Sequence, residues 1–92
     1  MTQTFNTAEE ARDILHDLQR RHLRLPHNSD IHKLIQNLDK MITDLSKLEV
    51  AARSVRNCRN RTIHIAVDRH KQQLTDAIKR IDQYLLMAQL MV

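Results

Sequence analysis

Glycine and tryptophan are absent from the chain, and proline and cysteine occur once each, at Pro26 and Cys58. β-Hairpins rely on glycine at their tight turns, above all in Asn-Gly and Asp-Gly pairs, so the lack of glycine argues against a hairpin-rich β-fold. Phe5 and Tyr84 are the only aromatic residues, and the remaining apolar residues are almost all aliphatic. Long aliphatic segments without glycine or proline predict an all-α protein.

The single cysteine excludes a disulfide within the chain and is typical of a reducing compartment, so we expect a cytoplasmic protein. The longest uncharged apolar stretch, residues 84–92, is about half as long as a membrane span, and no signal-peptide pattern opens the chain. A chain of 92 residues forms one small domain, and a domain of this size buries only roughly two-thirds of the surface of its unfolded form. Oligomerisation is a common source of additional stability for such domains.

The sequence predicts a frayed or disordered segment at residues 1–6, followed by a single helical domain over residues 7–92. The three predicted helices of this domain span about residues 8–23, 30–55 and 62–90. The first helix opens with a capping box, in which the Thr7 hydroxyl accepts a hydrogen bond from the Glu10 amide and the Glu10 carboxylate reaches back to the Thr7 amide. Pro26 separates the first helix from the second, because proline disfavours helical geometry at the residue before it.

The second predicted helix carries an aliphatic seam with alternating spacings of three and four residues: Ile31, Leu34, Leu38, Met41, Leu45, Leu48, Ala52 and Val55. Ile35 and Ile42 widen this stripe. A heptad-like seam of more than three repeats is typical of long helices packed at a shallow angle. On the polar side, Glu49 and Arg53 have the i,i+4 spacing of a helical ion pair.

Residues 56–62 interrupt this pattern with several weak helix formers, so we predict a turn there. One continuous helix from Asp30 onward is the alternative. The third helix ends differently from the other two, because residues 85–92 are apolar on every side. Such a pattern is typical of a helix that is buried on every side.

These elements predict an antiparallel three-helix bundle or a long helical hairpin that assembles into a larger bundle. The first helix spans only about 25 Å and the other two about 38–42 Å, so the first cannot cover the whole groove between them. The apolar residues left uncovered are expected to contact a partner: Ile35, Ile42, Leu86, Leu90 and Met91.

We therefore expect a non-enzymatic protein–protein interaction module, such as an adaptor, a regulator or a chaperone-like protein. Its expected partner is a second copy of the chain, in a homodimer, or a helix of another protein, and no cofactor, metal or small-molecule substrate is expected. A monomer in which the first helix suffices to cover the seams is the simpler alternative.

The formal net charge of +4 also allows binding to nucleic acid. Four arginines in or beside the predicted turn could contact phosphates: Arg53, Arg56, Arg59 and Arg61. The scarcity of aromatics argues against single-strand binding by base stacking. A nucleic-acid-binding regulator that depends on these arginines is the main alternative function.

Six histidines raise the question of a metal site, but none of them has the HxxxH or HExxH spacing of a zinc motif. His64 and Asp68, one helical turn apart, could share an ion. The segment 9–13, with the sequence Glu-Glu-Ala-Arg-Asp, resembles the first acidic motif of all-α, Mg²⁺-dependent nucleotide pyrophosphohydrolases. This resemblance implies a Mg²⁺-dependent hydrolase that uses Glu9, and no second acidic motif accompanies it.

Overall fold

The computed structural model describes residues 5–54 and 61–91, which form three α-helices and no strand. The helices are α1 (Ala8–Leu23), α2 (Ser29–Ser54) and α3 (Arg61–Leu90). The predicted all-α class is confirmed, and each described helix end lies within one residue of the predicted position. Residues 55–60, where most of the predicted turn falls, lie outside the described residues, as do residues 1–4 of the segment predicted to be frayed.

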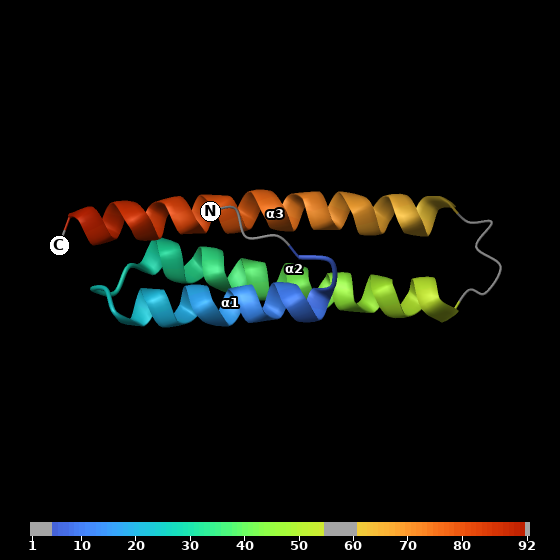
Figure 1. Ribbon diagram of the computed structural model, residues 1–92, viewed down its shortest axis with the longest axis horizontal. Helices are drawn as coiled ribbons and strands as arrows, with labels where there is room; N and C mark the ends of the chain where they lie inside the picture. Colours follow the sequence, from blue (N-terminus) through green and yellow to red (C-terminus); the bar gives the residue numbers. More distant parts are fainter. Residues whose placement is uncertain (1–4, 55–60, 92) are drawn as a thin grey trace.

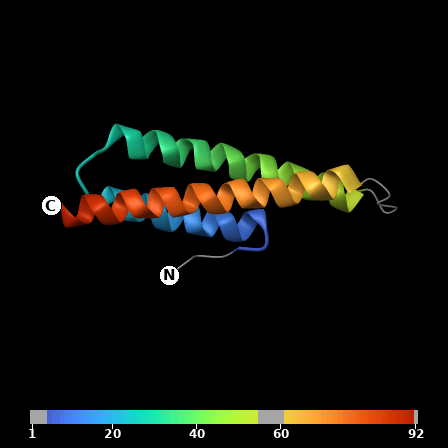
Figure 2. The same cartoon turned by 90° about the horizontal axis from the view of Figure 1, so that it is seen from above.

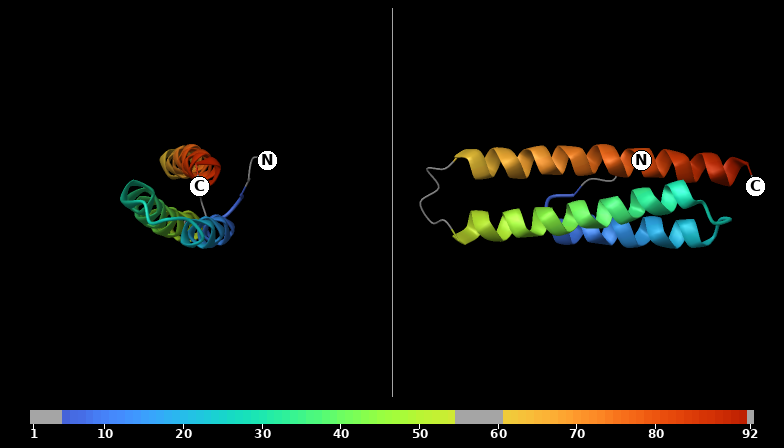
Figure 3. Two further views of the ribbon diagram at one scale, coloured as in Figure 1. Left: turned by 90° about the vertical axis from the view of Figure 1, so that its left-hand side faces the viewer. Right: turned by 180° about the vertical axis from the view of Figure 1, so that it is seen from behind.

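The three helices form an elongated antiparallel bundle with extents of 53 × 18 × 18 Å (Figure 1). α3 runs back along α2, so the alternative of one continuous helix from Asp30 onward is wrong. α2 packs against both of the other helices, whereas α1 and α3 touch much less (Figures 2 and 3). α1 lies beside the N-terminal part of α2, and the end of the hairpin near residues 54 and 61 therefore consists of two helices only.

The core is aliphatic and follows the helical periodicity of the sequence. Every helix contributes residues at spacings of three and four, which place them on one face. The buried apolar residues are Ala8, Ala11, Leu15, Leu18, Ile31, Ile35, Leu38, Ile42, Leu45, Leu74, Ile78, Ile81 and Leu85.

Ile35 and Ile42 belong to this core and not to an open surface, because their side chains are only 4% and 0% exposed. The prediction assumed that the wide stripe of α2 was more than the hairpin could cover. α2 instead packs against α1 and α3 at once, so the extra width of its stripe is used by a second neighbour. Leu34 and Met41, beside the stripe, are half-buried and pack against the same core.

The start of α1 is held by more contacts than its capping box predicts. The Thr7 hydroxyl accepts from the Glu10 amide at 3.2 Å, as predicted, but the Glu10 carboxylate accepts from the Asn6 amide at 2.8 Å, one residue earlier than predicted. Phe5 is half-buried against the core. Phe5 and Asn6 therefore make contacts that the prediction of a frayed segment at residues 1–6 did not include.

Polar contacts also link α1 to both other helices. The Glu49 carboxylate of α2 accepts a hydrogen bond from the Ala8 amide at 2.9 Å, where the helix dipole of α1 favours negative charge. Arg12 forms an ion pair with Asp39 of α2 at 2.9 Å. Arg21 forms an ion pair with Asp82 of α3. Such partly exposed pairs fix the relative placement of helices more than they stabilise them.

Within the described ranges, none of the helices combines the length and the apolar character needed to cross a membrane.

The placement of Ile42 in the core predicts that shortening its side chain lowers the stability of the fold. Ile42→Val should reduce the free energy of unfolding by about 0.5–1.5 kcal/mol in urea titrations, because a buried methylene group is lost. Ile65→Val is the matched control, because it makes the same chemical change at a side chain that is 56% exposed, and it should leave the midpoint nearly unchanged. Equal losses in the two variants would contradict this placement.

Candidate functional site

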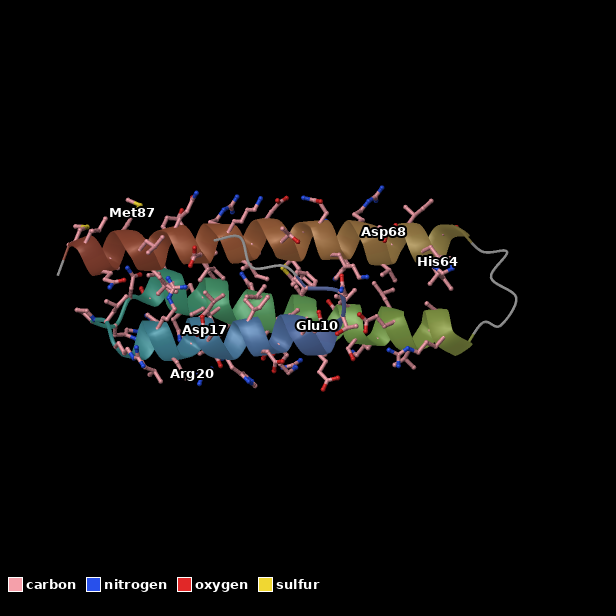
Figure 4. All side chains as sticks on the ribbon, viewed as in Figure 1. Glu10, Asp17, Arg20, His64, Asp68 and Met87 are labelled. Carbon is pink, nitrogen blue, oxygen red and sulfur yellow. The ribbon has the colours of Figure 1, made fainter. Side chains whose placement is uncertain are left out.

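Most of the large exposed apolar side chains lie at the C-terminal end of α3, and Leu23 at the end of α1 is 84% exposed as well. Five of them make up what we call the terminal patch, and their exposed fractions range from 45% to 85%: Tyr84, Leu86, Met87, Leu90 and Met91. Residues 85–90 include no charged residue, so this end of the helix is apolar or amide on every side. α1 and α2 bury only the inner face, which carries Ile81 and Leu85, and the outer side chains of the patch remain in contact with solvent. Figure 4 shows Met87 near this end of the bundle.

A groove of about 510 Å³ runs between the start of α2 and the end of α3, beside the patch. We call it the terminal groove. Its walls are mostly apolar, with charged residues only on the α2 side, and its lining residues are Asn28, Asp30, Ile31, Lys33, Leu34, Tyr84, Met87, Ala88 and Met91. The groove and the patch therefore share Tyr84, Met87 and Met91.

The charges beside the terminal groove are balanced. Asp30 and Lys33, one turn apart on α2, contribute one charge of each sign to its wall. On the side of α3 that faces α1, a smaller depression of about 280 Å³ is lined by Arg21, Arg24, Leu25, Leu85 and Gln89. Arg21 is already bound to Asp82 there.

Of the five predicted partner contacts, three lie in the terminal patch and two do not. Leu86, Leu90 and Met91 are exposed together, whereas Ile35 and Ile42 are buried. Tyr84, Met87 and Leu34 were not selected from the sequence. A helical wheel of α3 could have suggested Tyr84 and Met87, because they share one side with Met91, but only the packing of α2 reveals the groove wall at Leu34.

The opposite end of the hairpin carries less exposed apolar surface. Val50 and Ile65 are more than half exposed there, and small alanines take several of the neighbouring positions. Of the four arginines predicted to contact nucleic acid, Arg53 is exposed at the end of α2 and Arg61 begins α3. Arg56 and Arg59 lie outside the described residues, as does Cys58.

Three histidines line up at the connection between α1 and α2. The ring centroids of His22 and His27 are 5.8 Å apart, and those of His27 and His32 are 5.6 Å apart. His22 is 8% exposed, and its Nε2 accepts a hydrogen bond from the Asn28 amide at 3.4 Å. No spacing in the sequence indicates this row, because its members are separated by a loop and lie on different elements.

Burial lowers the pKa of His22 below its usual value of 6.5, and the nearby His27 and His32 lower it further. A buried imidazolium loses hydration, and additional positive charge close by disfavours it as well. The neutral form also fits the hydrogen bond, since Nε2 can accept from an amide only while it carries no proton.

A fourth histidine, His70, lies on the inner side of α3. Its Nε2 atom is buried, and no hydrogen-bond partner for this atom occurs among the described residues. A buried polar atom that lacks a partner costs about 1–3 kcal/mol. Among the described residues, His70 belongs to no group of three or more ligating side chains, so this atom defines no metal site.

The part of the chain that the structure describes contains no candidate metal centre. No group of three or more histidine, cysteine or acidic residues in these ranges could hold a metal ion. His64 and Asp68 lie toward the two-helix end, far along α3 from Met87 (Figure 4). In the acidic segment that resembles a hydrolase motif, Glu10 is used in capping and Arg12 pairs with a residue of α2.

Comparison of the chain with protein-family models, with curated proteins and with solved structures finds no match.

The lowered pKa of His22 predicts that acid destabilises the fold. The unfolded chain takes up this proton at about pH 6.5 and the folded chain only at lower pH, so the stability contributed by neutral His22 is present above pH 6.5 and is lost as the pH falls through the folded pKa. The free energy of unfolding, measured by urea titration between about pH 7.5 and 5, should therefore decrease before most carboxylates titrate.

Two variants test this assignment. His22→Gln keeps an acceptor oxygen without a titratable proton and should flatten the pH dependence, whereas His16→Gln, at an exposed position on the same helix, should leave it as in the wild type. A wild-type stability that is constant over this range would show that His22 does not titrate as described.

Proposed function

We propose that this chain is a non-enzymatic helical protein–protein interaction module that pairs with a second copy of itself through the terminal patch and the terminal groove. The observation that carries the proposal is the collection of large apolar side chains exposed around one end of α3. A regulator or adaptor fits this description, and the single cysteine favours a reducing, cytoplasmic location as part of the proposal.

The size of the patch supports association. Five side chains of about 200 Å² each, weighted by their exposed fractions, leave on the order of 600 Å² of apolar surface, which is at the upper end for the largest patch on a typical monomer. Two such patches together bury about 1,200 Å², near the lower limit for specific interfaces. Interfaces near this limit are typical of weak, transient association, so the expected dimer is weak.

The arrangement of side chains and charges at this end favours a second copy as the occupant. Leu90 and Met87 are one helical turn apart on the outer side of α3, so a two-fold axis can pack the Leu90 side chain of each copy on the terminal patch of the other. The groove wall carries Asp30 and Lys33, so a two-fold axis that places Asp30 of one copy beside Lys33 of the other forms two pairs of unlike charges. Each copy carries a net charge of +4, and pairing through a charge-balanced wall avoids adding local repulsion to that net charge.

Replacing Leu90 with lysine should weaken this dimer. The side chain is 85% exposed in the single chain, so the fold should persist, but burial of about 1.5–3 kcal/mol per leucine is lost on pairing. Sedimentation equilibrium should show a dissociation constant raised by about tenfold or more, since about 1.4 kcal/mol corresponds to a factor of ten.

The matched control is Ile65→Lys, which adds the same charge at an exposed isoleucine toward the other end of α3 and should leave association as in the wild type. Weakening by Ile65→Lys alone would move the interface to the two-helix end and contradict the proposed surface. A wild-type chain that remains monomeric at several hundred micromolar would contradict the proposed dimer.

A further inference from the structure

We propose that His22 makes the terminal groove sensitive to pH, because a proton on His22 releases Asn28, and Asn28 forms part of the groove wall. This inference deepens the proposed function and rests on it, since it names how the same docking surface is regulated. It depends on three features of the connection between α1 and α2: a buried acceptor nitrogen, a capping residue shared with the groove, and a concentration of positive charge.

The first feature is the hydrogen bond between the two elements. The Asn28 amide donates to His22 Nε2 at 3.4 Å, and His22 is almost fully buried near the end of α1. A backbone amide can only donate, so this contact requires an unprotonated Nε2. Protonation would place two N–H groups against each other, and the contact would be lost.

The second feature is the position of Asn28 at the start of α2. Its side-chain oxygen accepts from the Asp30 amide at 2.9 Å and from the Ile31 amide at 3.2 Å, so Asn28 caps this helix. Asn28, Asp30 and Ile31 all line the terminal groove. A shift of Asn28 away from His22 therefore displaces the cap and one wall of the groove together.

The third feature is the charge around His22. Its charged and titratable surroundings include His27 in the connection and His32 and Asp39 on α2, and Arg20, Arg21 and Arg24 lie within two residues of it in the sequence. The Asp39 carboxylate is already bound by Arg12, and Arg21, next to His22 in the sequence, is bound to Asp82 of α3. A proton on His22 is thus added to a region rich in cations, beside two further imidazole rings.

These features give the connection two states with different groove walls. In the neutral state, the Asn28 amide is held by His22 and the cap of α2 is in place. In the protonated state, that anchor is absent, and Asn28 shifts together with the cap of α2 and its part of the groove wall. A partner that binds the first state better will bind less tightly in acid, by the difference in its affinity for the two states.

The experiment measures dimer dissociation by sedimentation equilibrium at about pH 7.5 and 5.5, together with the pH titration of the Asn28 amide resonance in the wild-type chain. We expect the dissociation constant to rise by about fivefold or more at the lower pH, which is the lower end of usual coupling between sites. The Asn28 amide should titrate with a midpoint below the usual histidine value, in step with the His22 ring.

His22→Gln should have the same dissociation constant at both pH values, because the titrating group is gone, whereas His16→Gln should keep the pH difference of the wild type. Equal dimerisation of the wild type at both pH values would overturn the pH regulation and leave the proposed dimer standing. An Asn28 amide that does not titrate, or that follows the His27 ring and not the His22 ring, overturns it as well, and this result does not require that any variant folds. A chain that is monomeric at both pH values overturns the proposed dimer itself and the regulation with it.

Discussion

The packing of α2 between two helices of unequal length determines where this protein buries apolar surface and where it exposes it. Ile35 and Ile42 make the stripe of α2 wider than one neighbour can cover, and α1 and α3 both pack against it. Since α1 and α3 touch each other much less, α2 is the element through which the bundle holds together. Loss of either neighbour would expose part of the same stripe, which makes folding of the three helices interdependent.

The two ends of the bundle deal with apolar surface in different ways. At the two-helix end, α1 is too short to contribute, and small alanines at positions such as Ala51 and Ala66 reduce the surface that needs cover. At the other end all three helices are present, and yet more apolar surface is exposed there, because the last two turns of α3 are apolar on every side. The surface available to a partner therefore comes from the composition of one helix end and not from the shortness of α1.

The sequence was sufficient for the fold and for part of the site. Periodicity and capping residues predict helices near their observed ends, because these signals are local. They could not show that Ile35 and Ile42 are buried, since a wide stripe predicts either a second neighbour in the same chain or a partner. Contacts across the bundle could not be predicted from the sequence either. Glu49 has the spacing of a surface pair with Arg53, but its carboxylate accepts a hydrogen bond from the Ala8 amide, 41 residues away in the sequence.

Within the row of histidines, His22 lowers the stability of the fold relative to a leucine, and this loss argues that the residue has a role of its own. The apolar stripe of α1 runs through Ala11, Leu15 and Leu18, and the next position on that face is His22. A leucine there would continue the stripe and would add apolar burial without the penalty of burying a polar ring. Histidine gives up that stabilisation but supplies the acceptor that the Asn28 amide uses. The start of α2, and with it the terminal groove, is consequently joined to α1 by a group that gains a proton as the pH falls, which an aliphatic side chain could not do.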